Sequence, residues 1–156
     1  RLLDAYEQTQ EYLETMQQEM EALLSDIPMA KQLQSVGLGT VAQAAILGLG
    51  GDPNRYAHGR QFLRRAGLNL AECTSGKFKG QIKLSKRGDS VLRKYLYIAV
   101  VGLVGQHPDF RRWHAQNQAR GMKKNASIFK LIGKLARIII GMVRRRELYR
   151  SEVVAA

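Results

Sequence analysis

Residues 2–27 carry apolar side chains at alternating intervals of four and three positions, with Glu and Gln in most of the flanking positions. This heptad pattern is typical of one long helix whose apolar seam needs a partner helix. We expect the partner to be a second copy of the chain or a neighbouring helix of the full protein, and packing on the chain's own domain is the alternative. The seam positions are Leu2, Tyr6, Thr9, Leu13, Met16, Met20, Leu23 and Ile27.

Pro28 follows and ends this helix, because a residue before proline is disfavoured in the helical conformation. Two glycines then flank one apolar residue, and the small-residue run 42–49 comes next. The pattern predicts a tight turn before a helix that begins near Thr40, with the Thr40 hydroxyl as its N-cap. It resembles a helix-hairpin-helix, in which turn amides and a helix N-terminus meet a phosphate; a plain turn is the equally weighted alternative. The candidate backbone contacts are Gly37, Leu38, Gly39 and Thr40.

The rest of the chain predicts a mainly α-helical domain. Apolar residues in 125–146 recur at helical spacing, and we expect this stripe to pack on the apolar stretch 96–104 as the core. A basic helix lying on a membrane surface is the weaker interpretation. Residues 68–86 lack helical periodicity and predict an irregular loop or a short β-hairpin. Further helices are expected over 55–65, from an Asp89 N-cap to about Gly105, and over 109–120, with Gly67 and Gly121 as terminators.

Three segments result: a coiled-coil helix over 1–27, a compact domain over 28–150 and a tail over 151–156. A length of 156 residues suits one domain with a core plus one appended element. The chain begins with Arg1 rather than Met, so we expect it to be part of a longer protein.

Charge is unevenly distributed along the chain. Residues 1–27 hold seven acidic and one basic side chain, whereas residues 28–156 hold 24 basic and six acidic ones. The second segment therefore carries a charge of +18, and such a surface repels itself unless a polyanion relieves the repulsion. Nucleic acid is the expected partner. A cationic surface that serves only solubility is the weaker alternative.

Cysteine and histidine contribute little chemistry. Cys73 is the one cysteine, so no disulfide can form within the chain, as is usual in a reducing compartment. The three histidines and the cysteine show no metal-ligand spacing, and we expect neither a metal nor a cofactor in this chain. No apolar run reaches the length of a membrane span, so we expect a cytoplasmic protein with no membrane partner.

A basic segment around Ser75 is the candidate for chemistry. The Ser75 hydroxyl sits beside Gly76, which has no side chain to keep a phosphodiester away. Nearby lysines would stabilise charge on a reacting phosphate. Because a serine hydroxyl needs a base or a metal to activate it, the residues alone favour a phosphate-binding loop over a nucleophile. The basic residues of this candidate surface are Lys77, Lys79, Lys83, Lys86, Arg87 and Arg93.

Two stretches of the chain carry ordered motifs. The first has them at 36–41, Gly51-Asp52, Arg55-Tyr56 and Gly67-Leu68; the second has them at Ser75-Gly76, Gly80, Ile82, Ser85-Lys86, Gly88, Leu92-Arg93 and Leu96. Together they resemble a family of bacterial insertion-sequence transposases that includes pilin-gene inverting recombinases and bridge-RNA-guided recombinases. The resemblance covers roughly residues 25–148. At the position where the family usually has Asn, after Gly88, this chain has Asp89.

This resemblance implies a DNA transposase with a composite active site. Carboxylates of a RuvC-like domain, outside these 156 residues, would hold Mg²⁺, and a serine would attack DNA to form a phosphoserine link. The matching serine is Ser75, with Ser85 in reserve. The implied partners are DNA, a guide RNA and a second copy of the chain joined through the coiled coil. The isolated chain is expected to be inactive. A non-catalytic helix-hairpin-helix module that binds nucleic acid is the alternative.

Overall fold

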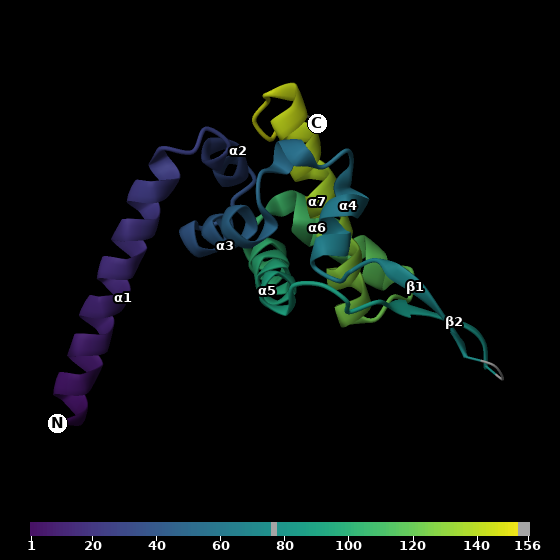
Figure 1. Ribbon diagram of the computed structural model, residues 1–156, viewed down its shortest axis with the longest axis horizontal. Coiled ribbons are helices and arrows are strands. Elements are labelled where there is room, and N and C mark those ends of the chain that lie inside the picture. Colours follow the sequence, from purple (N-terminus) through teal and green to yellow (C-terminus); the bar gives the residue numbers. More distant parts are fainter. Residues whose placement is uncertain (76–77, 153–156) are drawn as a thin grey trace.

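The computed structural model describes residues 1–75 and 78–152, with side chains described outside 71–82. Helices dominate the described residues, as predicted. In Figure 1 the helix α1 leads away from one side of a helical body, and a β-hairpin leaves the other side. In chain order the elements are α1 (Leu2–Ser25), α2 (Ala30–Ser35), α3 (Thr40–Gly50), the 3₁₀ turn η1 (Pro53–Arg55), α4 (Gly59–Arg65), β1 (Leu70–Ser75), β2 (Phe78–Leu84), α5 (Ser90–Gln106), α6 (Pro108–Ala119) and α7 (Lys124–Arg145).

The core forms around α7, which packs against α4, α5 and α6. Its predicted apolar stripe is buried, and Ile132 and Leu135 are fully inaccessible to solvent. Leu96 and Val100 of α5 face the same core, so the predicted packing of 125–146 on 96–104 is confirmed. Phe62 brings α4 into this cluster. Burial of such side chains contributes roughly 1.5–3 kcal/mol each, which makes α7 the element on which the others depend.

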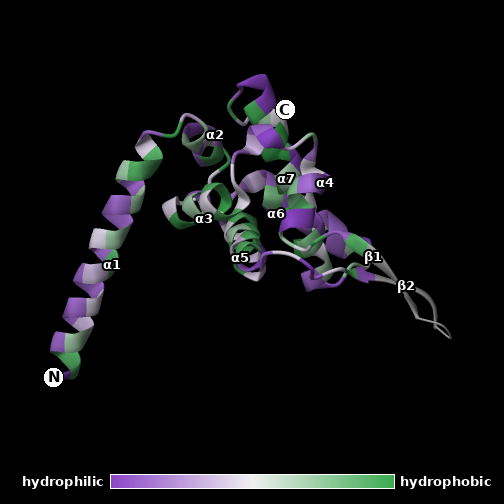
Figure 2. Ribbon diagram, in the orientation of Figure 1, coloured by the Kyte–Doolittle hydropathy of each residue, from purple (hydrophilic) through white to green (hydrophobic). Residues whose placement is uncertain are grey.

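Helix α1 behaves differently, because only its last turns touch the body. Leu24 is buried and α1 contacts α3. The apolar seam itself is open to solvent, even in the last turn: Leu2, Leu13 and Leu23 are 90%, 61% and 69% exposed. Figure 2 shows polar and apolar residues alternating along the free helix. The alternative that α1 packs on its own domain therefore holds only near its C-terminal end.

The predicted turn between two helices lies between α2 and α3. Gly37 adopts a φ of +96°, a conformation that side chains disfavour, and the chain reverses there. Leu38 is buried in the turn, and its carbonyl accepts a hydrogen bond from the buried Gln43 amide at 2.7 Å. The α3 N-cap is Gly39, with no side-chain cap. The predicted N-cap role of Thr40 is wrong: its hydroxyl donates instead to Glu21 of α1 at 3.3 Å.

The helix expected over 55–65 begins later than predicted, at Gly59. Asp52 caps a 3₁₀ turn over Pro53–Arg55, and Tyr56 then becomes extended. The Tyr56 hydroxyl donates to the Gly50 carbonyl, and its ring packs edge-on against Phe62 at 5.4 Å. These tertiary contacts outweigh the local helical preference of the segment.

The other predicted boundaries are close to those observed. The Asp89 side chain accepts hydrogen bonds from the amides of Val91 and Leu92, each at 2.9 Å, and so caps α5 as expected. Gly67 and Gly121 have positive φ angles just beyond α4 and α6. No helix among the described residues is long and apolar enough to cross a bilayer.

Candidate nucleic-acid interface

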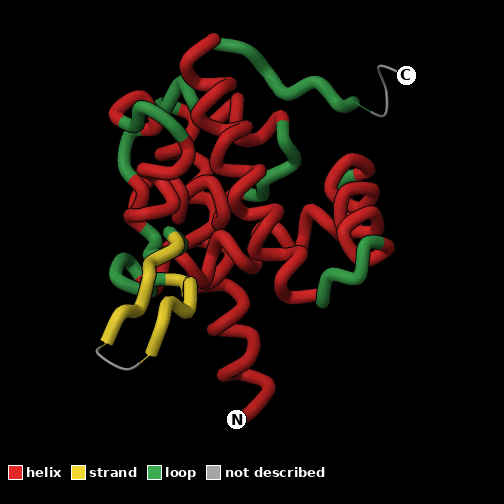
Figure 3. Tube along the Cα trace, turned by 90° about the vertical axis from the view of Figure 1, so that its right-hand side faces the viewer, coloured by secondary structure: helices red, strands yellow, loops and turns green. Residues whose placement is uncertain are grey.

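The candidate serine lies on the projecting hairpin. Strands β1 and β2 are antiparallel, and Leu70 pairs with Leu84 at the base while Ser75 pairs with Phe78 at the far end. Figure 3 shows both strands (yellow) extending beyond the helices (red). The backbone of Ser75 is thus placed away from the helical body, at the end of a strand. The Ser75 side chain lies outside the described set, as do Gly76 and Lys77.

The base of the hairpin is clamped to the end of α4. A side chain on Gly88 would place its Cβ only 2.3 Å from the Gly67 nitrogen and 2.5 Å from the Arg65 carbonyl oxygen. The Lys86 amide donates to the Gly67 carbonyl at 3.0 Å, and the Asp89 amide donates to Arg65 at 2.7 Å. Lys86 takes up a left-handed φ of +52° at this crossing. Gly88, one of the glycines of the second matched stretch, is therefore required because a side chain there would collide with the backbone of α4 and Gly67.

Ser85, the reserve nucleophile, is part of this clamp. Its hydroxyl donates to the Asn69 side-chain oxygen at 2.7 Å and accepts from the Arg87 amide at 3.3 Å. Its own amide donates to the Asn69 carbonyl at 2.9 Å. These bonds hold the two ends of the hairpin together, which accounts for the presence of Ser85 on structural grounds alone.

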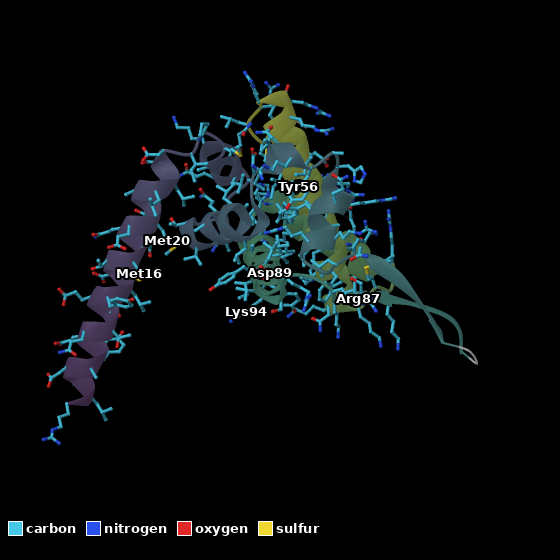
Figure 4. All side chains as sticks on the ribbon, in the orientation of Figure 1. Met16, Met20, Tyr56, Arg87, Asp89 and Lys94 are labelled. Atoms are coloured by element: carbon cyan, nitrogen blue, oxygen red, sulfur yellow. The ribbon has the colours of Figure 1, made fainter. Side chains whose placement is uncertain are left out.

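The basic candidates of this segment fall into three groups. Lys83, Lys86 and Arg87 are exposed around the hairpin base, and Figure 4 places Arg87 there. Arg93 is half-buried and donates to the Ala66 carbonyl at 3.0 Å, so one of its nitrogens supports the end of α4. The side chain of Lys79, like that of Lys77, lies outside the described set. The described cations therefore surround the base of the hairpin.

The glycine turn over 37–40 forms a separate candidate surface. Figure 1 shows α2 and α3 at the opposite end of the body from the hairpin. Gly37 and Gly39 are exposed, whereas the Leu38 side chain is buried. The Glu21 carboxylate lies at the α3 N-terminus through its contact with Thr40, where it meets the positive end of the helix dipole. A phosphate at this turn would compete with that carboxylate.

Several basic side chains that the sequence left without a role come together on α7. Lys130, Lys134 and Arg137 lie off the apolar stripe, as their spacing indicates, but only the structure shows what they face. The Lys134 ammonium lies 3.3 Å from the centre of the Trp113 ring. Burial lowers the pKa of Lys134, and Glu152 partly opposes the shift. The sequence shows the helical spacing of Lys130, Lys134 and Arg137, but it does not show which helix these side chains face.

A metal site does not form from the described residues. No group of three or more His, Cys, Asp or Glu side chains among them is placed to hold an ion. The residues described here therefore do not fit Mg²⁺, and we derive no step through a metal from them.

The fold and the basic hairpin define a helical domain suited to a polyanionic partner. Residues 30–116 match the model of the transposase IS116/IS110/IS902 family. This match covers more than half of the chain, and the chain belongs to that family. A protein of Pseudomonas aeruginosa described as "Probable family 20 transposase" is 29% identical over 128 residues. The alignment covers 80% of this chain and 38% of that relative, so the chain spans well under half the length of the relative.

Proposed function

We propose that this chain is the DNA-handling part of an insertion-sequence transposase and that Ser75 is its attacking hydroxyl. The observation that carries this proposal is the position of the Ser75 backbone at the far end of β1, on a hairpin whose base is clamped to α4. Catalytic groups act best from elements whose position is held by their surroundings. The hairpin base carries the exposed cations Lys83, Lys86 and Arg87, which would hold DNA phosphates on either side of the one that Ser75 attacks.

The proposed step is a transesterification. A bond forms between Ser75 Oγ and the phosphorus, and one of the two phosphodiester P–O bonds breaks. The hydroxyl proton passes to a base, and the departing sugar oxygen leaves with a proton as a free hydroxyl. Attack by a second DNA hydroxyl on the phosphoserine would complete strand exchange and restore the serine. A cation beside the reacting phosphate would stabilise the charge that develops on its oxygens.

The activating groups belong, in this proposal, to another part of the protein. Carboxylates of a RuvC-like domain would supply Mg²⁺ and the base, and the composite site would form when that domain meets the hairpin. The same proposal includes DNA and a guide RNA as partners and the bacterial chromosome as the place of action. The relative's length leaves room for such a domain, since the aligned region is 38% of it.

We also propose that α1 pairs with another helix, such as α1 of a second copy. The exposed seam supports this: Leu2 and Tyr6 are 90% and 67% exposed on a helix that touches the body only at its end. Most helical stability in proteins comes from the packing of an apolar face, and the open seam of α1 has no such packing within this chain. Sedimentation should show a concentration-dependent dimer that Leu13→Asp abolishes. A monomer at all concentrations would refute the pairing of two copies.

The alternative function is a binding module without chemistry. The exposed glycine turn between α2 and α3 favours it, because Gly37 and Gly39 have no side chain that would keep a phosphate from the turn backbone. The Gly37 amide itself is already used, since it donates to the Gln34 carbonyl at 2.8 Å. Ser75 would then only hold a phosphate.

Ser75→Ala in the full-length protein separates the two functions. Under the proposal, strand exchange is abolished while DNA affinity falls by no more than about tenfold, since one neutral hydrogen bond contributes roughly 0.5–1.5 kcal/mol. Ser85→Ala is the matched control: it should weaken the hairpin clamp yet leave exchange measurable. Exchange that survives Ser75→Ala, with Ser85→Ala inactive, would transfer the role to Ser85. Nicking by the isolated chain with Mg²⁺ would contradict the composite site.

A further inference from the structure

Helix α7 presents a row of cations on the face opposite its buried stripe. Lys130, Lys134, Arg137 and Arg145 follow one another at intervals of four, three and eight residues, which keeps them on one side of a helix. The residues between them, such as Leu135 and Ile139, face the core. Like charges at such spacing destabilise a helix by a few tenths of a kcal/mol per pair. Something that relieves this repulsion is therefore expected on that face.

The row lines two adjoining hollows. One, of about 160 Å³, lies between α6 and α7. The other, of about 520 Å³, runs along the second half of α7 to residues 147–150. Lys134 and Arg137 line both hollows, so the two form one trough. We call this surface the α7 trough; its basic residues are Arg120, Lys130, Lys134, Arg137, Arg145 and Arg150. Among the described residues one acidic side chain, Glu147, lines it, and Glu152 acts on Lys134 from nearby.

The trough leads to the base of the hairpin. Lys130 also lines a third hollow, of about 590 Å³, whose other walls include Asn69, Leu70 and Leu84. Asn69 is the residue that holds Ser85, and Leu70 and Leu84 are the first pair of the hairpin. The row of α7 cations thus begins beside the base of the hairpin that carries Ser75.

Two of the cations are held in place before any ligand arrives. The Lys130 ammonium donates to the Asn117 side-chain oxygen at 3.1 Å. Asn117 in turn donates to the buried Ser127 hydroxyl, which lies 2.8 Å from the His114 ring nitrogen. The second cation, Lys134, stacks on Trp113. Cations that are already ordered lose less side-chain entropy when they bind.

The dimensions suit one strand of a nucleic acid. Fifteen helical residues separate Lys130 from Arg145, which corresponds to about 22 Å along the axis. Phosphates of one duplex strand rise about 3.4 Å each along the duplex axis while they wind around it, so only a few of them could face the row at once. An acidic protein segment is the competing occupant. Protein interfaces are depleted in Lys, although they are enriched in Arg, whereas a phosphate backbone is bound by spaced cations of either kind.

We propose that the α7 trough is a second phosphodiester-binding surface, which guides one nucleic-acid strand along α7 to or from the hairpin. This inference rests on the proposed function in assuming a nucleic-acid partner, but it does not depend on Ser75. DNA and RNA offer the same backbone chemistry, and the test distinguishes them.

Trp113 is the single tryptophan, and it reports on the trough directly. The 156-residue chain is titrated with a mixed-sequence oligonucleotide of about 20 nucleotides as duplex DNA, single-stranded DNA and RNA. We expect a saturable change in Trp113 emission, because a phosphate draws Lys134 away from the ring. The nucleic acid that gives the tightest transition is the natural occupant. No emission change with any of the three, at concentrations where anisotropy shows full binding, would overturn the proposal.

The test variant is Arg137→Gln/Arg145→Gln, which leaves the Lys134–Trp113 reporter intact. Affinity should fall at least about tenfold, and the slope of log K against log salt should lose about two units, one for each phosphate contact removed. The charge-matched control is Lys31→Gln/Lys94→Gln; neither residue lines the trough, and the emission transition should keep its midpoint within about threefold. Equal losses in both variants would refute a specific trough.

A measurement on the unaltered chain does not depend on whether the variants fold. Saturating oligonucleotide should slow acetylation of Lys130 and Lys134 at least about fivefold and leave Lys31 unchanged, as read by mass spectrometry. Unprotected trough lysines would overturn the proposal. So would displacement of the oligonucleotide from Trp113 by a peptide of residues 1–27 at an equal concentration, which would identify an acidic protein segment. Intact strand exchange in Ser75→Ala together with a functional trough would refute only the proposed nucleophile.

Discussion

Helices α1 and α7 were both predicted from the spacing of their apolar residues, yet the structure uses them in opposite ways. The stripe of α7 is buried, with Ile132 and Leu135 inaccessible, and its polar face is basic. The seam of α1 is open to solvent and its polar face is acidic. Periodicity therefore identifies a helix and its apolar face, but not whether the covering partner lies in the same chain. Four substitutions test this difference, beginning with the largest expected effect.

Leu135→Ala should destabilise the isolated chain by about 2–5 kcal/mol, because it opens a cavity in a core that packs around α7. Leu13→Ala, the same change in α1, should alter stability by less than about 0.5 kcal/mol in the monomer. Urea denaturation of both variants below the concentration of self-association makes the comparison. A large loss in Leu13→Ala would show that the α1 seam is already packed.

The segment that follows α7 is hydrogen-bonded to Asp109 of α6. The Tyr149 hydroxyl donates to the buried Asp109 carboxylate at 2.6 Å, and Asp109 also accepts from the Glu152 amide at 3.0 Å. Burial and the bond to Asp109 raise the pKa of Tyr149 well above its ordinary value of 10.0. Tyr149→Phe should lower the free energy of unfolding by about 1.5 kcal/mol at about pH 8. This value is low for a hydrogen bond to a charged group because Tyr149 is partly exposed.

The stabilising effect of Tyr149 should depend on pH. Below about pH 10 the tyrosine is protonated in both the folded and the unfolded chain, so its stabilising effect is fully present. As the pH rises above about 10, the unfolded chain loses this proton first, and the stability of the unaltered chain falls. The Tyr149→Phe variant has no such proton, so the difference in stability between the two proteins should narrow between about pH 9 and 11. A constant difference would contradict the raised pKa.

Glu21→Gln addresses the junction where α1 touches the body. The carboxylate accepts from Thr40 at 3.3 Å and from Gln17 at 3.1 Å, both at exposed positions. Loss of the Glu21 charge from the α3 N-terminus should lower the free energy of unfolding by no more than about 0.5 kcal/mol. If the turn over 37–40 binds phosphate, oligonucleotide affinity should rise slightly, because a competing anion is gone. A loss of affinity on fluorescence titration would count against that site.

Much of the helical fold followed from local signals. Asp89 caps α5 as predicted, and it fills the position where Asn is usual in the family, since both side chains can accept from the first helical amides. Gly67 and Gly121 terminate helices as expected. The start of α4 was missed because Tyr56 is held by Gly50 and Phe62, contacts that no local pattern encodes.

The candidate site was predictable in its position along the chain but not in its surroundings. Motif order identified Ser75 and Ser85 as candidates, but only the structure shows Ser85 bonded to Asn69 and Arg87. The α7 trough was not predicted, because it depends on α6 and the chain after α7 lying beside Lys134. Helical spacing placed those cations on one face without saying what lies across from them.

The central claim is that Ser75 bonds to DNA, and the most direct test is to find that bond. Full-length protein is quenched with denaturant during strand exchange, treated with nuclease and digested with trypsin. Cleavage after Arg65 and Lys77 places Ser75 in peptide 66–77, whereas Ser85 falls in peptide 84–86. We predict a nucleotide mass on peptide 66–77 that fragmentation assigns to Ser75 and that Ser75→Ala removes. A nucleotide on peptide 84–86, or exchange that proceeds with no modified peptide, would contradict the account.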